Sequence, residues 1–258
     1  MPADFTPGAP CWFDVTAPDI PAAADFYTGL FGWSAVDTGP DSHHYTLLLQ
    51  DGHRVAGVAA ATTPDGVVKP ALWLPYFAVA DAETTTATAV HTGAGVFVGP
   101  TEVPGELVFA ILTDPDGAPY GLAQLLAHPG TERWGEVDNP CWVEYGAART
   151  PSEAMAHYAE IFGWQYGNAA WETAAVNPYQ ALSVDPGREF GGAHIAVPGE
   201  PAPYWSMSIR VAGVDETVSR AIELGGKVLK EPEDLPGPSR LAVLADPAGA
   251  GFAVMSVG

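Results

Sequence analysis

The feature that most constrains this chain is an internal repeat whose period is about half of its length. Pro10-Cys11-Trp12 returns as Pro140-Cys141-Trp142, and Phe31-Gly32-Trp33 returns as Phe162-Gly163-Trp164, at offsets of 130 and 131 residues. A solenoid would need three or more short units. Two long units in one register therefore predict a pair of duplicated globular domains.

Later landmarks keep nearly the same register. Trp73 and Trp205 lie 132 residues apart, so the offset between equivalent residues grows from 130 to 132 along the chain. Two single-residue insertions are predicted to account for this change. A chain of 258 residues is long enough for two domains that each bury a core. We expect an N-terminal domain at 1–130 and a C-terminal domain at 136–258, with the linker between them.

The charge balance limits the kinds of partner. Ten basic residues stand against 31 acidic ones, a formal net charge of -21, so a phosphate backbone or an anionic membrane would be repelled. We expect a small-molecule ligand, no nucleic acid, no membrane, and a monomer or homodimer.

The two cysteines, Cys11 and Cys141, occupy one repeated position and suit buried reduced thiols, and no secretory signal precedes them, which favours a cytoplasmic protein.

Each copy divides into two similar halves. In the first copy, residues 12–17 alternate as a strand, 20–31 follow helical spacing up to Gly32, and short strands are expected at 45–49 and 55–61. A second strand and helix follow at 72–79 and 81–90, and the second copy repeats the order. The predicted unit is therefore βαβββ, four times over. Paired units of this kind leave a concave trough in which a ligand would lie.

Three motifs carry a family resemblance: Phe26-Tyr27, Phe31-Gly32-Trp33 and Asp114-Pro115-Asp116-Gly117, which recur as His157-Tyr158, Phe162-Gly163-Trp164 and Asp246-Pro247-Ala248-Gly249. The chain resembles the glyoxalase, bleomycin-resistance and extradiol dioxygenase (vicinal oxygen chelate) superfamily, as a tandem two-domain, glyoxalase-like or hydroxylase-labelled member. The resemblance implies an α+β fold of two tandem domains. Each would be a pair of βαβββ modules forming a concave, U-shaped mixed sheet with its helices outside.

Enzymes of that family usually hold a divalent metal with His, Gln or Glu ligands. The corresponding positions in this chain are Trp12, Trp142, Leu74, Ser206, Gly121 and Ala253. None of these is a strong ligand for such a cation, so we expect no metal and no other cofactor. A fallback metal site would use His194 and Glu144.

Seven histidines are candidates to replace the missing ligands: His43, His44, His53, His91, His128, His157 and His194. Most have positions typical of structural or exposed residues. His194 is the exception because it lies in a later strand that could line the second trough near Glu144. Such a pair could be two metal ligands, or a general base with its partner, or a hydrogen-bonded part of the core.

Strand alternation predicts what lines each trough. For the first trough we expect Trp12, Asp14, Thr16 and Tyr76; for the second, Trp142, Glu144, Ser206, Ser208 and Arg210, with Arg240 and Met255 depending on register. Aromatic rings beside a carboxylate suit a flat or cationic organic ligand. The alternative is that Trp12 and Trp142 simply fill the troughs.

Three functions follow from these expectations. The leading one is a metal-independent protein that sequesters an organic ligand in an aromatic, acidic trough. The second is a lyase, isomerase or hydroxylase-like enzyme that uses Asp14 or Glu144 as a base, with Tyr76 or Arg240 steadying an anion, or a metalloenzyme at His194 and Glu144. The third is a pair in which one copy binds a ligand and the other serves only dimerisation.

Overall fold

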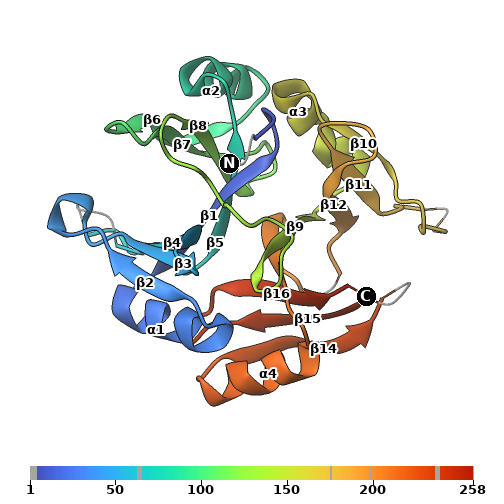
Figure 1. Ribbon diagram of the computed structural model, residues 1–258. Helices are drawn as coiled ribbons and strands as arrows, with labels where there is room; N and C mark the ends of the chain where they lie inside the picture. Colours follow the sequence, from blue (N-terminus) through green and yellow to red (C-terminus); the bar gives the residue numbers. More distant parts are fainter. Residues whose placement is uncertain (1–4, 63–65, 175, 198, 236–238, 258) are drawn as a thin grey trace. The chain divides into compact units, whose positions relative to one another are not determined.

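The structure is a computed structural model that describes residues 5–62, 66–174, 176–197, 199–235 and 239–257. Its elements follow one order four times (Figure 1). The first module comprises β1 (Pro10–Ala17), α1 (Ile20–Phe31), β2 (Ser34–Asp37), a 3-10 turn (Pro40–Ser42), β3 (Thr46–Gln50) and β4 (His53–Ala60). The second comprises β5 (Trp73–Ala78), α2 (Ala82–His91), β6 (Gly95–Val103), β7 (Leu107–Thr113) and β8 (Pro119–Leu125).

The second copy repeats this order. Its first module comprises β9 (Asn139–Ala147), α3 (Pro151–Phe162), β10 (Gln165–Asn168), β11 (Gln180–Ser183) and β12 (Glu189–Ile195). Its second comprises β13 (Tyr204–Arg210), α4 (Val214–Glu223), β14 (Lys227–Asp234), β15 (Arg240–Ala245) and β16 (Gly251–Ser256). The predicted βαβββ unit is therefore confirmed.

The strands form two eight-stranded mixed sheets with the same order. One sheet runs β2-β3-β4-β1-β5-β8-β7-β6, and the other runs β10-β11-β12-β9-β13-β16-β15-β14. In each module the first strand pairs in parallel with the last, as β1 does with β4 and β9 does with β12, and the other neighbours are antiparallel. The predicted α+β fold with two tandem copies is confirmed.

Local chemistry sets the ends of the helices. Asp19 accepts a hydrogen bond from Ala22 N at 3.0 Å and so caps α1, and Asp81 caps α2 in the same way through Thr84 N at 2.7 Å. α1 ends at Gly32, whose φ of 72° lies in the left-handed region that favours glycine. Gly163, at φ 70°, ends α3 in the same way. These caps explain why the helices could be placed from the sequence.

The chain divides into two compact units that each combine parts of both copies. The first unit holds residues 1–12, 75–130 and 142–206, and the second holds 13–74, 131–141 and 207–258. Each unit thus contains one helix-bearing module from each copy: α2 contacts α3 in the first unit, and α1 contacts α4 in the second. The domain boundaries expected at 130 and 136 stay a prediction.

A tyrosine and an aspartate from different copies meet in the core of the second unit. Tyr27 on α1 donates a hydrogen bond to Asp246 Oδ2 at 3.0 Å and accepts one from Trp73 Nε1 at 2.9 Å. All three side chains are buried. The Phe-Tyr and Asp-Pro motifs of the sequence are therefore two ends of one buried contact.

The first unit repeats this contact with an additional donor. Tyr158 on α3 donates to Asp114 Oδ2 at 2.9 Å and accepts from Trp205 Nε1 at 2.8 Å, while Tyr145 donates to the same Oδ2 at 2.6 Å. The other carboxylate oxygen of Asp114 accepts the N–H groups of the turn that follows it, including that of Ala118 at 2.8 Å. A buried carboxylate is tolerated because its acceptor sites are filled.

The register of the repeat drifts further than two single insertions would allow. Gly57 pairs with Asp14, and Gly192 pairs with the equivalent Glu144. These two glycines lie 135 residues apart in the sequence, against 130 for the two carboxylates. The expectation from the landmarks was wrong because the loops before β4 and β12 differ in length while the strands around them keep their pairing.

Two further observations concern the environment of the chain. No helix among the described residues is both long and apolar enough to cross a membrane. Cys11 and Cys141 are free thiols, the first buried and the second partly exposed. Burial raises the pKa of Cys141 to about 12 despite the opposing charge of Arg210, so this thiol is a weak nucleophile at neutral pH.

Candidate functional site

The two repeated carboxylates, Asp14 and Glu144, each bind a tyrosine across a glycine. Tyr45 donates its hydroxyl to Asp14 Oδ1, and Tyr179 donates to Glu144 Oε2 at 2.8 Å. A Cβ on the opposing glycine, Gly57 in the first copy, would overlap the tyrosine hydroxyl. Glycine is therefore required at this register so that the phenol can reach the carboxylate.

The residues predicted for the first trough are closed off from solvent. Asp14 is 8% exposed, Trp12 is 3% exposed and Tyr76 is 6% exposed. The ring of Trp12 packs edge-on against His128 at a centroid distance of 4.5 Å. The ring of Tyr76 lies where a side chain on Gly121 would be. These contacts fit the alternative in which the aromatic side chains fill space.

Glu144 in the second copy is more accessible and fully hydrogen-bonded. Its side chain is 24% exposed. Oε2 accepts Trp142 Nε1 at 3.1 Å and the Tyr179 hydroxyl at 2.8 Å, and Oε1 lies 2.8 Å from His194 Nδ1. Burial first, and then the charge of Glu144, raise the pKa of Tyr179 well above its ordinary value, so this phenol remains a donor. The carboxylate is consequently held by three donors.

His194 bridges two glutamates. Its Nδ1 faces Glu144, and its Nε2 lies 3.3 Å from Oε2 of Glu200, which also accepts Val197 N at 3.0 Å. Burial by itself would lower the pKa of His194, but the hydrogen bonds and charges of Glu144 and Glu200 outweigh it and the net pKa is raised. The imidazole is 25% exposed, so a small molecule can reach it.

Aromatic rings surround this group of charged side chains. Trp171, 52% exposed, packs against Tyr179 at a centroid distance of 4.9 Å. Tyr204 packs edge-on to His194 at 6.3 Å, over the backbone at Gly146. We call Trp142, Glu144, Trp171, Tyr179, His194, Glu200 and Tyr204 the Glu144 cluster. All of its members belong to the first compact unit.

The remaining predicted residues lie apart from the Glu144 cluster or contribute little to it. Ser206 is partly exposed, whereas Ser208 is buried and its carbonyl accepts the Cys141 thiol at 3.4 Å. Arg210 donates to the backbone carbonyl of Gly135 at 3.1 Å. None of these contacts prepares the serines or the arginine for an anionic ligand.

Arg240 is engaged elsewhere. Its guanidinium donates to both carboxylate oxygens of Asp215 on α4, at 2.9 and 3.0 Å, and to Asp234 on β14 at 2.7 Å. A bidentate contact of this kind fixes the fork of an arginine on the helix side of its strand. Met255 pairs with Leu241 in the neighbouring strand and is partly exposed. The role foreseen for Arg240, steadying an anion in a trough, has no support in this geometry.

Sequence reasoning missed Tyr179, Glu200, Trp171 and Tyr204. The first could have been found by aligning it with Tyr45, since each precedes the third strand of its module, but the longer loop hides the correspondence. Glu200 lies in the connection between β12 and β13, which carries no periodic pattern. The position equivalent to His194 in the first copy is Ala59, as the pairings of β1 with β4 and of β9 with β12 show.

The residues present do not fit a divalent metal. Among the described residues, no group of three or more His, Cys, Asp or Glu side chains is arranged to hold one. In the Glu144 cluster the imidazole stands between the two carboxylates, so its nitrogens point at their oxygens and not toward a shared centre. We therefore derive no chemical step through a metal.

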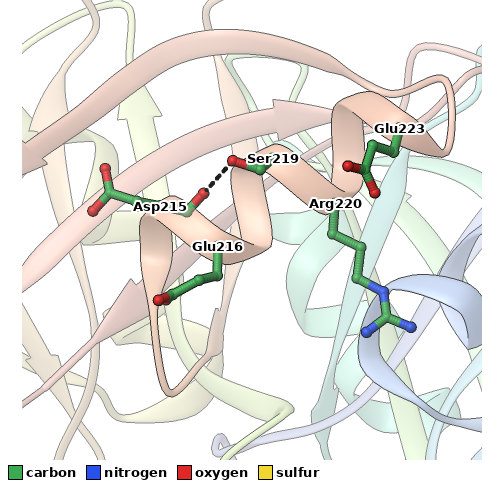
Figure 2. A pocket seen from close by; sticks show the side chains of 5 residues that line it. All are labelled: Asp215, Glu216, Ser219, Arg220 and Glu223. Carbon is green, nitrogen blue, oxygen red and sulfur yellow. Dashed lines mark hydrogen bonds between the residues drawn. The ribbon is translucent and has the colours of Figure 1, made fainter.

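A surface hollow lies on α4, in the second unit. It is lined by Asp215, Glu216, Ser219, Arg220 and Glu223, all from the same helix (Figure 2). Ser219 donates back to the carbonyl of Asp215 at 2.9 Å, as Figure 2 shows. Open, charged side chains along one helix do not enclose a ligand, so the Glu144 cluster stays the candidate site.

Sequence comparison identifies the relatives of the chain. The pattern of the glyoxalase/bleomycin resistance protein/dioxygenase superfamily matches residues 11–120, and that of a glyoxalase-like domain matches residues 143–255. An anthracycline biosynthesis protein, DnrV of Streptomyces peucetius, is 36% identical and covers 98% of this chain and 94% of its own.

Solved structures share the fold at low identity. A Mn(II)-bound glyoxalase from Novosphingobium aromaticivorans is 13% identical with a TM-score of 0.64, covering 97% of this chain and 82% of its own. The 2,3-dioxygenase LapB from Pseudomonas sp. KL28 is 15% identical with a TM-score of 0.66, covering 98% and 94%. At such identities the likeness extends to the fold alone.

Proposed function

The chain belongs to the glyoxalase/bleomycin resistance protein/dioxygenase superfamily, and from that premise we propose that it is a metal-independent protein that sequesters a flat aromatic or cationic organic ligand. The observation that carries the proposal is the Glu144 cluster. It combines two partly exposed carboxylates with four aromatic side chains in one compact unit. The equivalent carboxylate of the first copy, Asp14, is buried.

The physical reason is complementarity of shape and charge. Aromatic rings give a planar ligand large contact areas at low entropic cost, and a cation near a ring face is further stabilised. Glu144 and Glu200 carry two negative charges and His194 carries at most one positive charge, so the cluster is net negative. The formal charge of -21 adds long-range attraction for a cation.

The name of one relative supports an aromatic ligand. The name of DnrV refers to anthracycline biosynthesis, and anthracyclines are planar polycyclic aromatic compounds. We propose by this analogy that the ligand of the present chain is of similar planarity.

Binding can be tested with two matched probes. 9-Aminoacridine is a flat cation at neutral pH, and acridine is its uncharged counterpart; both are fluorescent. We expect 9-aminoacridine to bind saturably and more tightly than acridine. Glu144→Gln should weaken the binding of 9-aminoacridine by about tenfold, which corresponds to roughly 1.4 kcal/mol. It should affect the binding of acridine less.

The first copy supplies the control. Asp14→Asn changes the equivalent carboxylate, and we expect it to leave the affinity for 9-aminoacridine within about twofold because Asp14 is 8% exposed. Folding of each variant is checked by circular dichroism. Saturable binding that is insensitive to Glu144→Gln, or no binding of either probe, would contradict the proposal.

A second candidate function is an enzyme that moves a proton, such as a lyase or isomerase. The observation that favours it is the direct contact between His194 and Glu144. The sequence predicts Asp14 or Glu144 as the base of such an enzyme. The hydrogen bonds around Glu144 bear on that assignment.

A further inference from the structure

The carboxylate of Glu144 is poorly placed to act as a base. Its Oε2 already accepts two hydrogen bonds, from Trp142 and Tyr179, and its Oε1 accepts the imidazole of His194. Both carboxylate oxygens are thus already engaged as acceptors, so a proton from a substrate could reach them only by displacing one of these donors. The group that Glu144 orients is a better candidate.

His194 has the geometry of an oriented base. Glu144 Oε1 lies 2.8 Å from Nδ1, which favours the tautomer whose proton sits on Nδ1 and leaves the lone pair on Nε2. Nε2 lies 3.3 Å from Glu200 Oε2, an acceptor that can bind only the protonated ring, so in the neutral ring Glu200 must turn away before the Nε2 lone pair meets a substrate. Glu144 is itself fixed from behind by Tyr179 and Trp142. This is the pattern of a base aligned by a third group.

We propose that Nε2 of His194 is a general base for aromatic carbon acids bound at the Glu144 cluster, with Glu144 as its positioning residue. The inference rests on the proposed function, because the aromatic rings must first hold the substrate. Proton abstraction from a carbon next to a carbonyl, and return of the proton to a neighbouring carbon, would be an isomerisation. This reaction requires no oxidant, metal or cofactor.

Several groups affect the charge state of this imidazole. Glu144 on β9 and Glu200 in the connection after β12 both favour the protonated ring. Tyr204 on β13 lies against it, and its own pKa is raised by burial first and then by the charge of Glu200, so it stays neutral. Tyr179 acts only through Glu144. The pKa of His194 therefore lies above the ordinary histidine value of about 6.5, and the ring becomes a base as the pH rises through it.

The first copy shows what the chain looks like without the base. Ala59 occupies the position of His194, and the carboxylate and tyrosine pair, Asp14 and Tyr45, is retained there. An alanine is therefore compatible with this strand. His194→Ala reproduces a solution that the chain already uses, so loss of activity in this variant would not be explained by a misfolded strand.

The test uses an activated carbon acid, 5-nitro-1,2-benzisoxazole. The base removes the proton from C3, the C–H electron pair forms the third bond between carbon and nitrogen, the N–O bond breaks, and the oxygen leaves as a coloured phenolate. Atoms and electrons balance with the base alone. Formation of 2-cyano-4-nitrophenolate is followed by absorbance, and binding of the benzisoxazole is measured separately by displacement of 9-aminoacridine.

We expect a saturable elimination rate that His194→Ala lowers by about a hundredfold or more, the usual contribution of a general base. The exposed His91 is the control, and His91→Ala should leave the rate unchanged. The rate should rise with pH through the pKa of His194. Glu144→Gln should lower kcat and move that inflection to lower pH, Glu144→Asp should restore part of kcat, and Glu200→Gln should move the inflection with a smaller loss of kcat.

A readout that needs no substrate completes the test. Nitrogen NMR of the imidazole in the free protein reports which ring nitrogen carries the proton in the neutral form. A proton on Nδ1 supports the proposal, and a proton on Nε2 overturns it.

The outcomes separate the two proposals. A benzisoxazole that binds but reacts equally fast with wild type and His194→Ala overturns the base and leaves ligand binding intact. If 9-aminoacridine binds but benzisoxazole does not displace it, the cluster does not hold aromatic carbon acids, and the present inference fails alone. If neither compound binds, both proposals fail.

Discussion

The buried tyrosine contacts of the two units provide an internal comparison of stability. Tyr27→Phe removes a hydroxyl that donates to Asp246 and accepts from Trp73, and Tyr158→Phe removes the equivalent hydroxyl in the other unit. Both tyrosines are fully buried. A bond to a charged acceptor contributes about 1.5–3 kcal/mol, and one between neutral groups about 0.5–1.5 kcal/mol. Tyr27→Phe should therefore lower the free energy of unfolding by about 2–4 kcal/mol.

The second substitution should cost less. Asp114 Oδ2 keeps the hydroxyl of Tyr145 at 2.6 Å after Tyr158→Phe. Among the residues that the structure describes, Tyr27 is the one tyrosine that donates to Asp246, and the position equivalent to Tyr145 is Val15. We expect Tyr158→Phe to cost roughly 1 kcal/mol less than Tyr27→Phe, since a carboxylate that retains a donor avoids part of the desolvation penalty.

Urea unfolding followed by tryptophan fluorescence and by circular dichroism measures both free energies, and thermal unfolding gives an independent ranking. A difference of about 1 kcal/mol corresponds to roughly 2–4 °C in Tm for a chain of this size. Equal losses in the two variants, or a greater loss for Tyr158→Phe, would refute the reasoning that the additional donor on Asp114 matters.

Three further predictions follow. Burial lowers the pKa of His157, so the folded state resists protonation of this ring. The free energy of unfolding should therefore fall as the pH drops below about 6.5. His157→Phe, which copies Phe26 of the other unit, should flatten this pH dependence in urea titrations at pH 5 to 7. Gly192→Ala should destabilise by at least about 2 kcal/mol by displacing the Tyr179 hydroxyl, whereas Gly167→Ala, which meets open space, should cost less than about 1 kcal/mol in the same assay. Elemental analysis of protein purified without chelators or a histidine tag should find no stoichiometric divalent metal, and a full equivalent would reverse that expectation.

The sequence was informative wherever local chemistry acts by itself. The Asp and Gly residues at the ends of α1 placed that helix to the residue, and the fourfold order of elements followed from the repeat. Strands β2 and β6 could not be assigned residue ranges in this way. Every residue of β2 is exposed and β6 is exposed along most of its length, so neither shows the alternation by which a half-buried strand is detected.

The candidate site was only partly predictable. Strand alternation and the repeat pointed to Glu144, and the position of His194 in a later strand suggested the pair that the structure brings to 2.8 Å. Tyr179 and Glu200 enter from irregular connections, where no period links sequence to space. The partners of Arg240, on a helix and on a neighbouring strand, could not be predicted because tertiary packing brings them together.

Each compact unit combines segments of both copies, which has a consequence for synthesis on the ribosome. Residues 13–74 emerge early, yet their unit is completed only by residues 207–258. Until Asp246 has emerged, the hydroxyl of Tyr27 has no aspartate to bind, and until α4 has emerged, the apolar face of α1 lacks its partner helix. Residues 13–74 should therefore stay without a complete core until the end of synthesis. A nascent chain stalled between the copies should bind chaperones and be cleaved by proteases more readily than the finished protein.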